Sequence, residues 1–115
     1  MMRRFVRSTI ANATVTSGDS VALIVDPILL AAAALQPYEE VELVHHATGE
    51  RFTTFVQAGT EGSGEVRVHR IRTGDVVTIL SWGGLHDGQP LEHRVTVVTV
   101  DAANTVVAVE QTGAS

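Results

Sequence analysis

Apolar and polar positions alternate along most of the chain, in runs that have the length of strands rather than helices. Residues 3–15 place Phe5, Ile10 and Val15 among small and β-branched residues, which predicts one long strand with imperfect alternation. Residues 21–25 form a continuous apolar run, which is typical of a strand buried on both faces. The pattern therefore indicates a mainly β fold.

One segment departs from this pattern. Asp26 and Pro27 have the chemistry of an N-cap and a first helical residue, so the apolar run 28–35 predicts a short helix that ends before Pro37. The same run is the longest apolar stretch of the chain, and it is far too short to span a membrane.

The rest of the chain predicts further strands between turns. We expect strands at 40–46, 52–58, 66–70, 76–82, 91–100 and 105–109, with the first two forming a hairpin. Residues 83–90 form either a glycine-hinged lid or a plain connection. A chain of 115 residues supports one core, so we expect a single all-β domain over 1–115 with one short helix.

Composition excludes several kinds of chemistry. The chain has no cysteine, and all eight of its basic residues are arginine, so disulfides, thiolates and lysine Schiff bases are absent. The formal net charge of −5 argues against nucleic acid or an anionic membrane as a partner. His45 and His46 point to opposite faces of their strand and cannot chelate one metal ion together. We therefore expect a cytoplasmic protein without a metal site.

Two segments, TSGDSVAL and RTGDVVTI, repeat a Gly-Asp turn before an apolar strand. In each we expect the glycine to adopt a positive φ and the aspartate to bond the amides of the turn. Ser20 in the first segment is either a hydroxyl that braces this turn or a residue with a chemical role.

The order and spacing of several segments resemble the pyruvoyl-dependent aspartate 1-decarboxylases over roughly residues 1–82. The matching segments are MRRFVRSTIANATVT, ILLAAAAL, GERFTTF, EGSGEV and TGDVVTILSW. The resemblance implies a small double-psi β-barrel that assembles as a homo-oligomer, a tetramer, with active sites between subunits.

The resemblance also implies a covalent cofactor. Enzymes of that family are made as precursors that cleave themselves before a serine, and this serine becomes a pyruvoyl group. The matching residue is Ser20, but the segment before it is shorter here, and the bond would be Asp19–Ser20. Thr9 and Ala11 stand where the family has a lysine and a histidine of its active site.

Further on, the family's carboxylate-binding arginine matches Arg51, and its threonine three positions later matches Thr54. Its catalytic tyrosine is replaced by Phe55, which cannot transfer a proton. His69 stands where the family has another active-site residue. Trp82 either forms the floor of a pocket or packs in the core.

Both charged candidates have a structural alternative. Arg51 either holds a small anion or pairs on the surface with Glu42 or Glu50. His69 either transfers protons or lies exposed among arginines.

Three functional hypotheses follow. The first is an unprocessed relative that acts without a cofactor on a small carbonyl or carboxylate compound, as an isomerase, cyclase or lyase of a specialised biosynthetic pathway. Arg51 and Thr54 would then stabilise negative charge and His69 would transfer protons, while the side chains that would line the substrate pocket are Phe55, Trp82 and Thr9. The second is a pyruvoyl-dependent amino-acid α-decarboxylase, cleaved before Ser20. The third is a noncatalytic binding or assembly subunit.

Overall fold

The structure is a computed structural model that describes residues 2–86 and 94–113. The elements within these ranges follow the chain as β1 (Met2–Thr14), β2 (Leu23–Val25), α1 (Pro27–Ala32), β3 (Glu40–His45), β4 (Arg51–Ala58), β5 (Val66–Arg67), β6 (Val76–His86), β7 (Arg94–Val100) and β8 (Val106–Gly113). The mainly β fold with one short helix is thus confirmed. No helix in the described ranges is long and apolar enough to cross a bilayer.

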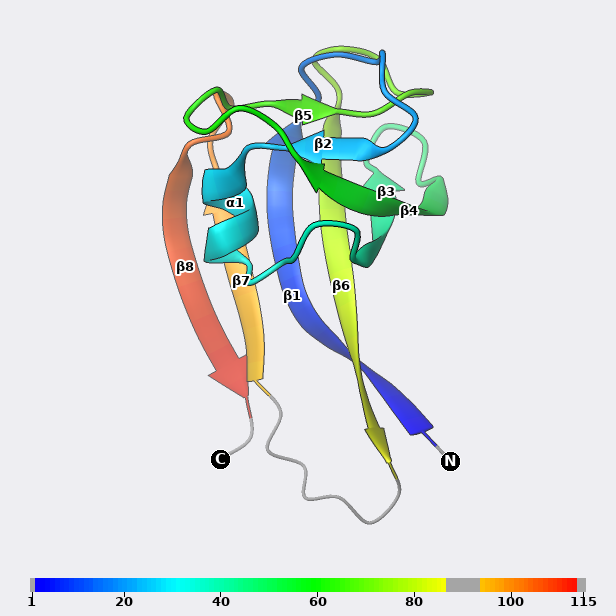
Figure 1. The fold of residues 1–115 in the computed structure, drawn as a ribbon, viewed down its shortest axis with the longest axis vertical. Helices are drawn as coiled ribbons and strands as arrows, with labels where there is room; N and C mark the ends of the chain where they lie inside the picture. Colours follow the sequence, from blue (N-terminus) through cyan, green and yellow to red (C-terminus); the bar gives the residue numbers. More distant parts are fainter. Residues whose placement is uncertain (1, 87–93, 114–115) are drawn as a thin grey trace.

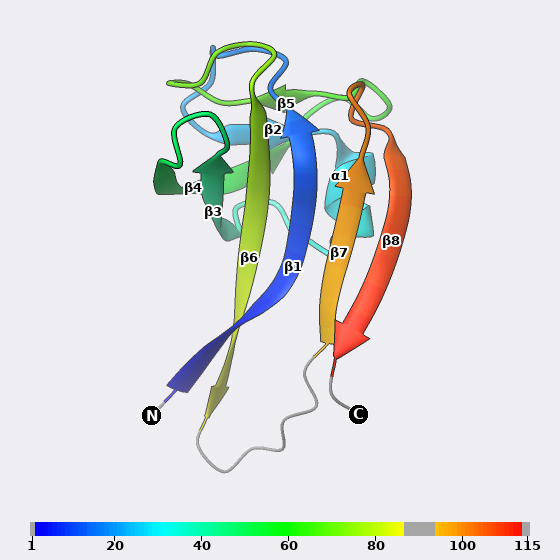
Figure 2. The ribbon, with the colours of Figure 1, turned by 180° about the vertical axis from the view of Figure 1, so that it is seen from behind.

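The strands join in one curled sheet of order β5-β2-β4-β3-β6-β1-β7-β8. The long strands β1 and β6 pair antiparallel and run side by side along the length of the molecule (Figures 1 and 2). The sheet is mixed, because β1 pairs parallel with β7 and β2 parallel with β4. The short strands β2, β4 and β5 cross one end of the β1–β6 pair in Figure 1, so the sheet curls around a core as in a small β-barrel.

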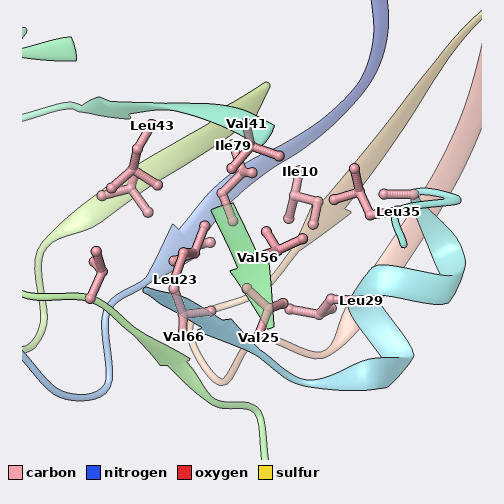
Figure 3. Close-up of a cluster of buried hydrophobic side chains, with 14 of the residues drawn as sticks. Ile10, Leu23, Val25, Leu29, Leu35, Val41, Leu43, Val56, Val66 and Ile79 are labelled. Carbon is pink, nitrogen blue, oxygen red and sulfur yellow. The ribbon is translucent and has the colours of Figure 1, made fainter. Parts of the chain in front are cut away.

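One cluster of buried apolar side chains fills this curl (Figure 3). Ile10 of β1, Leu23 of β2, Val56 of β4 and Ile79 of β6 meet there and are almost completely buried. Because alternate side chains of a strand face opposite sides, the residues between them face away from the core. The curled sheet therefore has an inner face on the core and an outer face that is available to a site.

The helix α1 begins where the sequence predicts and ends earlier. The Oδ1 atom of Asp26 accepts a hydrogen bond of 2.9 Å from the N–H of Ile28, as an N-cap does. The predicted helix over 28–35 stops at Ala32, because Ala34 adopts a φ of 55° and the N–H of Leu35 bonds the carbonyl of Leu30. This turn directs Leu35 into the core, where it is 5% exposed.

Strand β6 is longer than predicted. It was expected to end at Trp82, but it continues to His86 because the first half of β1 supplies hydrogen-bonding partners, with Phe5 opposite Gly83. Gly83 and Gly84 are therefore strand residues and not the hinge of a lid; the remainder of the predicted loop, 87–90, and residues 91–93 lie outside the described residues. Strand β5 is shorter than predicted and β8 is longer.

Candidate functional site

The strand register places predicted site residues in rows across the outer face. Thr9 of β1 lies opposite Leu80 of β6, Leu80 lies opposite Glu42 of β3, and Glu42 lies opposite Thr53 of β4. These four residues form one row, because paired residues of neighbouring strands point to the same face of a sheet.

Three more predicted residues share this face, since strand residues two positions apart point the same way. Arg51 and Phe55 flank Thr53 on β4, and Trp82 follows Leu80 by two positions on β6. Trp82 was predicted at the end of a strand but lies within one. The structure thus brings Thr9, Arg51, Phe55 and Trp82 onto one face.

A hollow of about 500 Å³ opens on this face. Its wall is formed by Arg7, Glu39, Glu40, Val41, Glu42, Thr53 and Trp82. Sequence reasoning found only Trp82 among these. The glutamates had a readable signal, because Glu40 and Glu42 alternate with the buried Val41 and Leu43 and so had to face away from the core.

A polar network closes one side of the hollow. The Arg7 guanidinium donates to the carbonyl of Ala34 at 2.9 Å, to the Ser81 hydroxyl at 2.8 Å and to the Glu39 carboxylate. The Ser81 hydroxyl in turn donates to Glu39 at 2.8 Å. The network joins β1, β6 and the segment after α1, and it neutralises both of its charges.

Arg51 lies at the edge of the hollow. Its side chain is 55% exposed, and its Nε donates to the carboxylate of Glu42, which is the cross-hairpin pairing considered above. The same contact holds the guanidinium beside the hollow, because Glu42 is part of the wall. Its two terminal amines have no hydrogen-bond partner among the described residues and can bind an anion bidentately.

Two predicted residues lie apart from this face. Thr54 pairs with the buried Val41 and points to the inner face, opposite to Arg51, because three positions along a strand reverse the direction of a side chain. His69 lies beside the β1–β2 connection, where its N–H donates to the carbonyl of Ser20 at 2.6 Å. Its Nδ1 is buried and has no hydrogen-bond partner among the residues that the structure describes. Ser20 and His69 thus form a second group, outside the wall of the hollow.

The turn before Ser20 is docked on residues 67–71. The Arg67 Nε donates to Asp19 at 3.0 Å, and this bond lowers the pKa of the Asp19 carboxyl below its usual range. The N–H of Val68 bonds the Ser17 carbonyl at 3.1 Å, and a Cβ on Gly18 would lie 3.0 Å from the Ile71 carbonyl oxygen.

The predicted likeness of the two Gly-Asp turns is only partly correct. Gly74 has a φ of 94°, but Gly18 is not in the positive region, because its turn is held by contacts with a neighbouring segment. The Asp19 carboxylate bonds its own backbone N–H and the Ser17 side chain, as well as Arg67 at 3.0 Å. The Asp75 carboxylate instead bonds His45 Nε2 at 2.8 Å and no amide of its turn in the described contacts.

His45, the last residue of β3, and His46, which follows it, point apart, as predicted. His45 is buried between Asp75 and Thr48, whereas the exposed His46 bonds the hydroxyl of Thr78 at 2.7 Å. Among the described side chains, no group of three or more histidines and carboxylates is arranged to hold a metal ion.

Comparison with known proteins assigns the chain to a family. The sequence model of the family described as aspartate decarboxylase matches residues 1–107, well past the predicted limit at 82. The chain belongs to the aspartate decarboxylase family.

Curated relatives agree with this assignment over nearly their whole length. An aspartate 1-decarboxylase of Mycolicibacterium smegmatis is 35% identical, with 95% of this chain and 86% of the relative covered. Those of Pelotomaculum thermopropionicum and Ralstonia pickettii are 33% and 30% identical, covering 96% and 97% of this chain and 90% and 100% of the relatives. The resemblance stated from the sequence is thereby confirmed, and the curled β sheet is consistent with the small barrel that it implied.

Proposed function

We propose that this member of the aspartate decarboxylase family is not self-processed and acts without a cofactor on a small carbonyl or carboxylate compound, as an isomerase, cyclase or lyase of a specialised biosynthetic pathway. The observation that supports the proposal is the hollow on the outer face, with Arg51 at its edge. Its wall is built from side chains that need no processing, and Ser20 is not among them.

The chemistry of the wall suits proton transfer beside a carbonyl group. The terminal amines of Arg51 would bind the carboxylate or carbonyl oxygen of the ligand, and the Thr53 hydroxyl would add a hydrogen bond. Glu42 would take a proton from the carbon next to the carbonyl, and Arg51 would stabilise the negative charge that then develops on oxygen. Return of the proton from Glu42 to another carbon completes an isomerisation. Thr54 and His69 lie outside the hollow. We therefore assign proton transfer to Glu42 and not to His69.

The docking of the turn before Ser20 supports the absence of processing. Cleavage would require the Ser20 hydroxyl to attack the carbonyl of Asp19, and this segment is restrained on both sides. The Ser17 and Ser20 carbonyls accept backbone hydrogen bonds, and the Asp19 side chain is bound by Arg67. Intact mass of the purified protein under denaturing conditions tests this directly: we expect one species of full length, and two fragments divided before Ser20 would contradict it.

Ligand binding tests the role of Arg51. Trp82 is the only tryptophan of the chain and lines the hollow, so its fluorescence reports occupancy. We expect pyruvate or malonate to change this signal in a saturable way, and Arg51→Ala to weaken binding about tenfold or more, since a charge-assisted bond is lost. Arg72→Ala, an exposed arginine of the turn before β6, is the control and should bind as the unmodified protein. Equal loss in both variants, or no saturable binding at all, would contradict the proposal.

A second candidate function is pyruvoyl-dependent decarboxylation. The relatives described as aspartate 1-decarboxylases favour it. The pyruvoyl group would supply an electrophilic carbonyl. The residues present fit this group only in part, because Thr9 lacks the amine of the family's lysine and Phe55 lacks the phenol of its tyrosine. This candidate predicts two fragments, and a Ser20→Ala variant that stays whole and does not decarboxylate aspartate.

A further inference from the structure

The charges around the hollow leave one carboxylate without a counter-charge. Arg7 pairs with Glu39, and Arg51 pairs with Glu42. The Glu40 carboxylate, the remaining charged group of the wall, has no hydrogen bond or ion pair among the described residues. A ligand that fills the hollow therefore meets one negative charge that the protein does not balance.

Aromatic residues lie near Glu40 on two other strands. Glu40 lies opposite Phe55 of β4, and the ring of Tyr38 stacks on Phe55 with centroids 6.3 Å apart and planes at 26°. The β3–β6 pairing ends at Glu42 and Leu80, and beyond it Glu40 and Trp82 line the same hollow. Phe55 is thus the cross-strand neighbour of Glu40, and the indole of Trp82 shares the hollow with it.

This arrangement selects the chemistry of the ligand. The faces of aromatic rings attract cations, and a carboxylate near such rings favours an ammonium group that is partly withdrawn from water. A hard metal ion requires more oxygen ligands than the single free carboxylate offers. We propose that Glu40, Trp82 and Phe55 form a subsite for a cationic nitrogen of the ligand.

The subsite also sets the length of that ligand. The guanidinium of Arg51 is held beside Glu42, which lies two residues from Glu40 on β3, a separation of roughly 7 Å along a strand. The α-ammonium of an amino acid lies only one carbon from the α-carboxylate, which is too close for the two groups to occupy both positions. The inference rests on the proposed function, because it concerns a second group of the same ligand: an ammonium several carbons from the carboxylate.

Two isomers provide the test with the full-length protein. The fluorescence of Trp82 is titrated with 5-aminopentanoate and with 2-aminopentanoate, which differ only in the position of the amine, and with pentanoate and pentylamine. Ionic strength is held constant, since exposed charges are screened by salt. We expect 5-aminopentanoate to bind about tenfold tighter than pentanoate or 2-aminopentanoate.

Variants assign the effect to the subsite. Glu40→Gln should reduce the affinity for 5-aminopentanoate to that for pentanoate, and Phe55→Leu should reduce it in part, while Glu110→Gln on β8 is the matched control and should change nothing. Glu40 and Glu110 are both exposed, so neither substitution is expected to disturb folding, which circular dichroism verifies.

The outcomes separate this inference from the proposed function. If pentanoate binds through Arg51 but the distal amine adds nothing, or if Glu40→Gln keeps the gain, the subsite is overturned and the proposed function stands. If pentylamine binds through Glu40 while no carboxylate binds through Arg51, the subsite stands and the proposed function fails.

Discussion

A single buried carboxylate, Asp26, joins the start of α1 to the β4–β5 connection. It is 3% exposed and accepts hydrogen bonds from the N–H groups of Ile28 at 2.9 Å, Gly62 at 3.1 Å and Gly64 at 2.9 Å. Burial alone would raise the pKa of this carboxyl, but the three bonds outweigh it, and the pKa is lowered from its ordinary value of 3.8. At the scale of residues, the ionised form is therefore part of the fold.

We expect Asp26→Asn to lower the free energy of unfolding at neutral pH by about 1–3 kcal/mol, because the amide nitrogen of asparagine would face a backbone donor. Because the pKa is lower in the folded state, ionisation stabilises the fold above the unfolded pKa, and this contribution is lost as the pH falls through the folded pKa. Urea unfolding between about pH 7 and pH 3 should thus show a smaller acid loss for Asp26→Asn than for the unmodified protein. Parallel pH curves would contradict the assignment, and Glu110→Gln serves as control.

At the scale of elements, the β4–β5 connection is fastened to the β7–β8 turn. The Asn104 side chain accepts from the N–H of Thr14 at 2.7 Å and donates to the carbonyls of Thr14 and Gly64, both at 2.8 Å. Gly64 has a φ of +71°, and a Cβ there would lie 2.6 Å from the carbonyl oxygen of Ala103. The backbones of two connections approach too closely here for any side chain.

The nearby Gly62 allows a matched test, since its φ is +79° but a Cβ would have no atom within 4 Å. Gly62→Ala should cost about 1 kcal/mol through backbone strain alone. Gly64→Ala adds a steric clash with the backbone and should cost roughly 2 kcal/mol more than that. Chemical denaturation measures both, and equal costs would show that the connections do not approach as closely as described.

At the scale of the whole molecule, the curled sheet separates a core face from a binding face. Adjacent residues of β3 test this separation: Leu43 is fully buried, whereas Val44 is half-buried on the outer face. Leu43→Ala should lower the free energy of unfolding by about 2–5 kcal/mol, because it leaves a cavity in the core. Val44→Ala should cost less than about 1.5 kcal/mol. The reverse order in urea unfolding would mean that the two faces are exchanged.

The site was only partly predictable from the sequence, because strand direction and strand pairing decide which residues share a face. Arg51 and Phe55 were selected by likeness to a family and share a face, but Thr54, selected in the same way, points to the core because it stands three positions from Arg51. Arg7 and Ser81 are 74 residues apart and bond each other only because β1 pairs with β6. Local spacing carries no information on such a contact.

The sequence by itself determined the family, the β class, the start of α1 at Asp26 and the absence of lysine and cysteine chemistry. These depend on residue identity, on alternation within one strand and on hydrogen bonds between near neighbours. Only the tertiary structure decided that β6 continues through Gly83 and that Glu40 lies opposite Phe55 and lines one hollow with Trp82. Both results depend on strand order and register, which are set by long-range packing of the curled sheet and not by any local stretch of the chain.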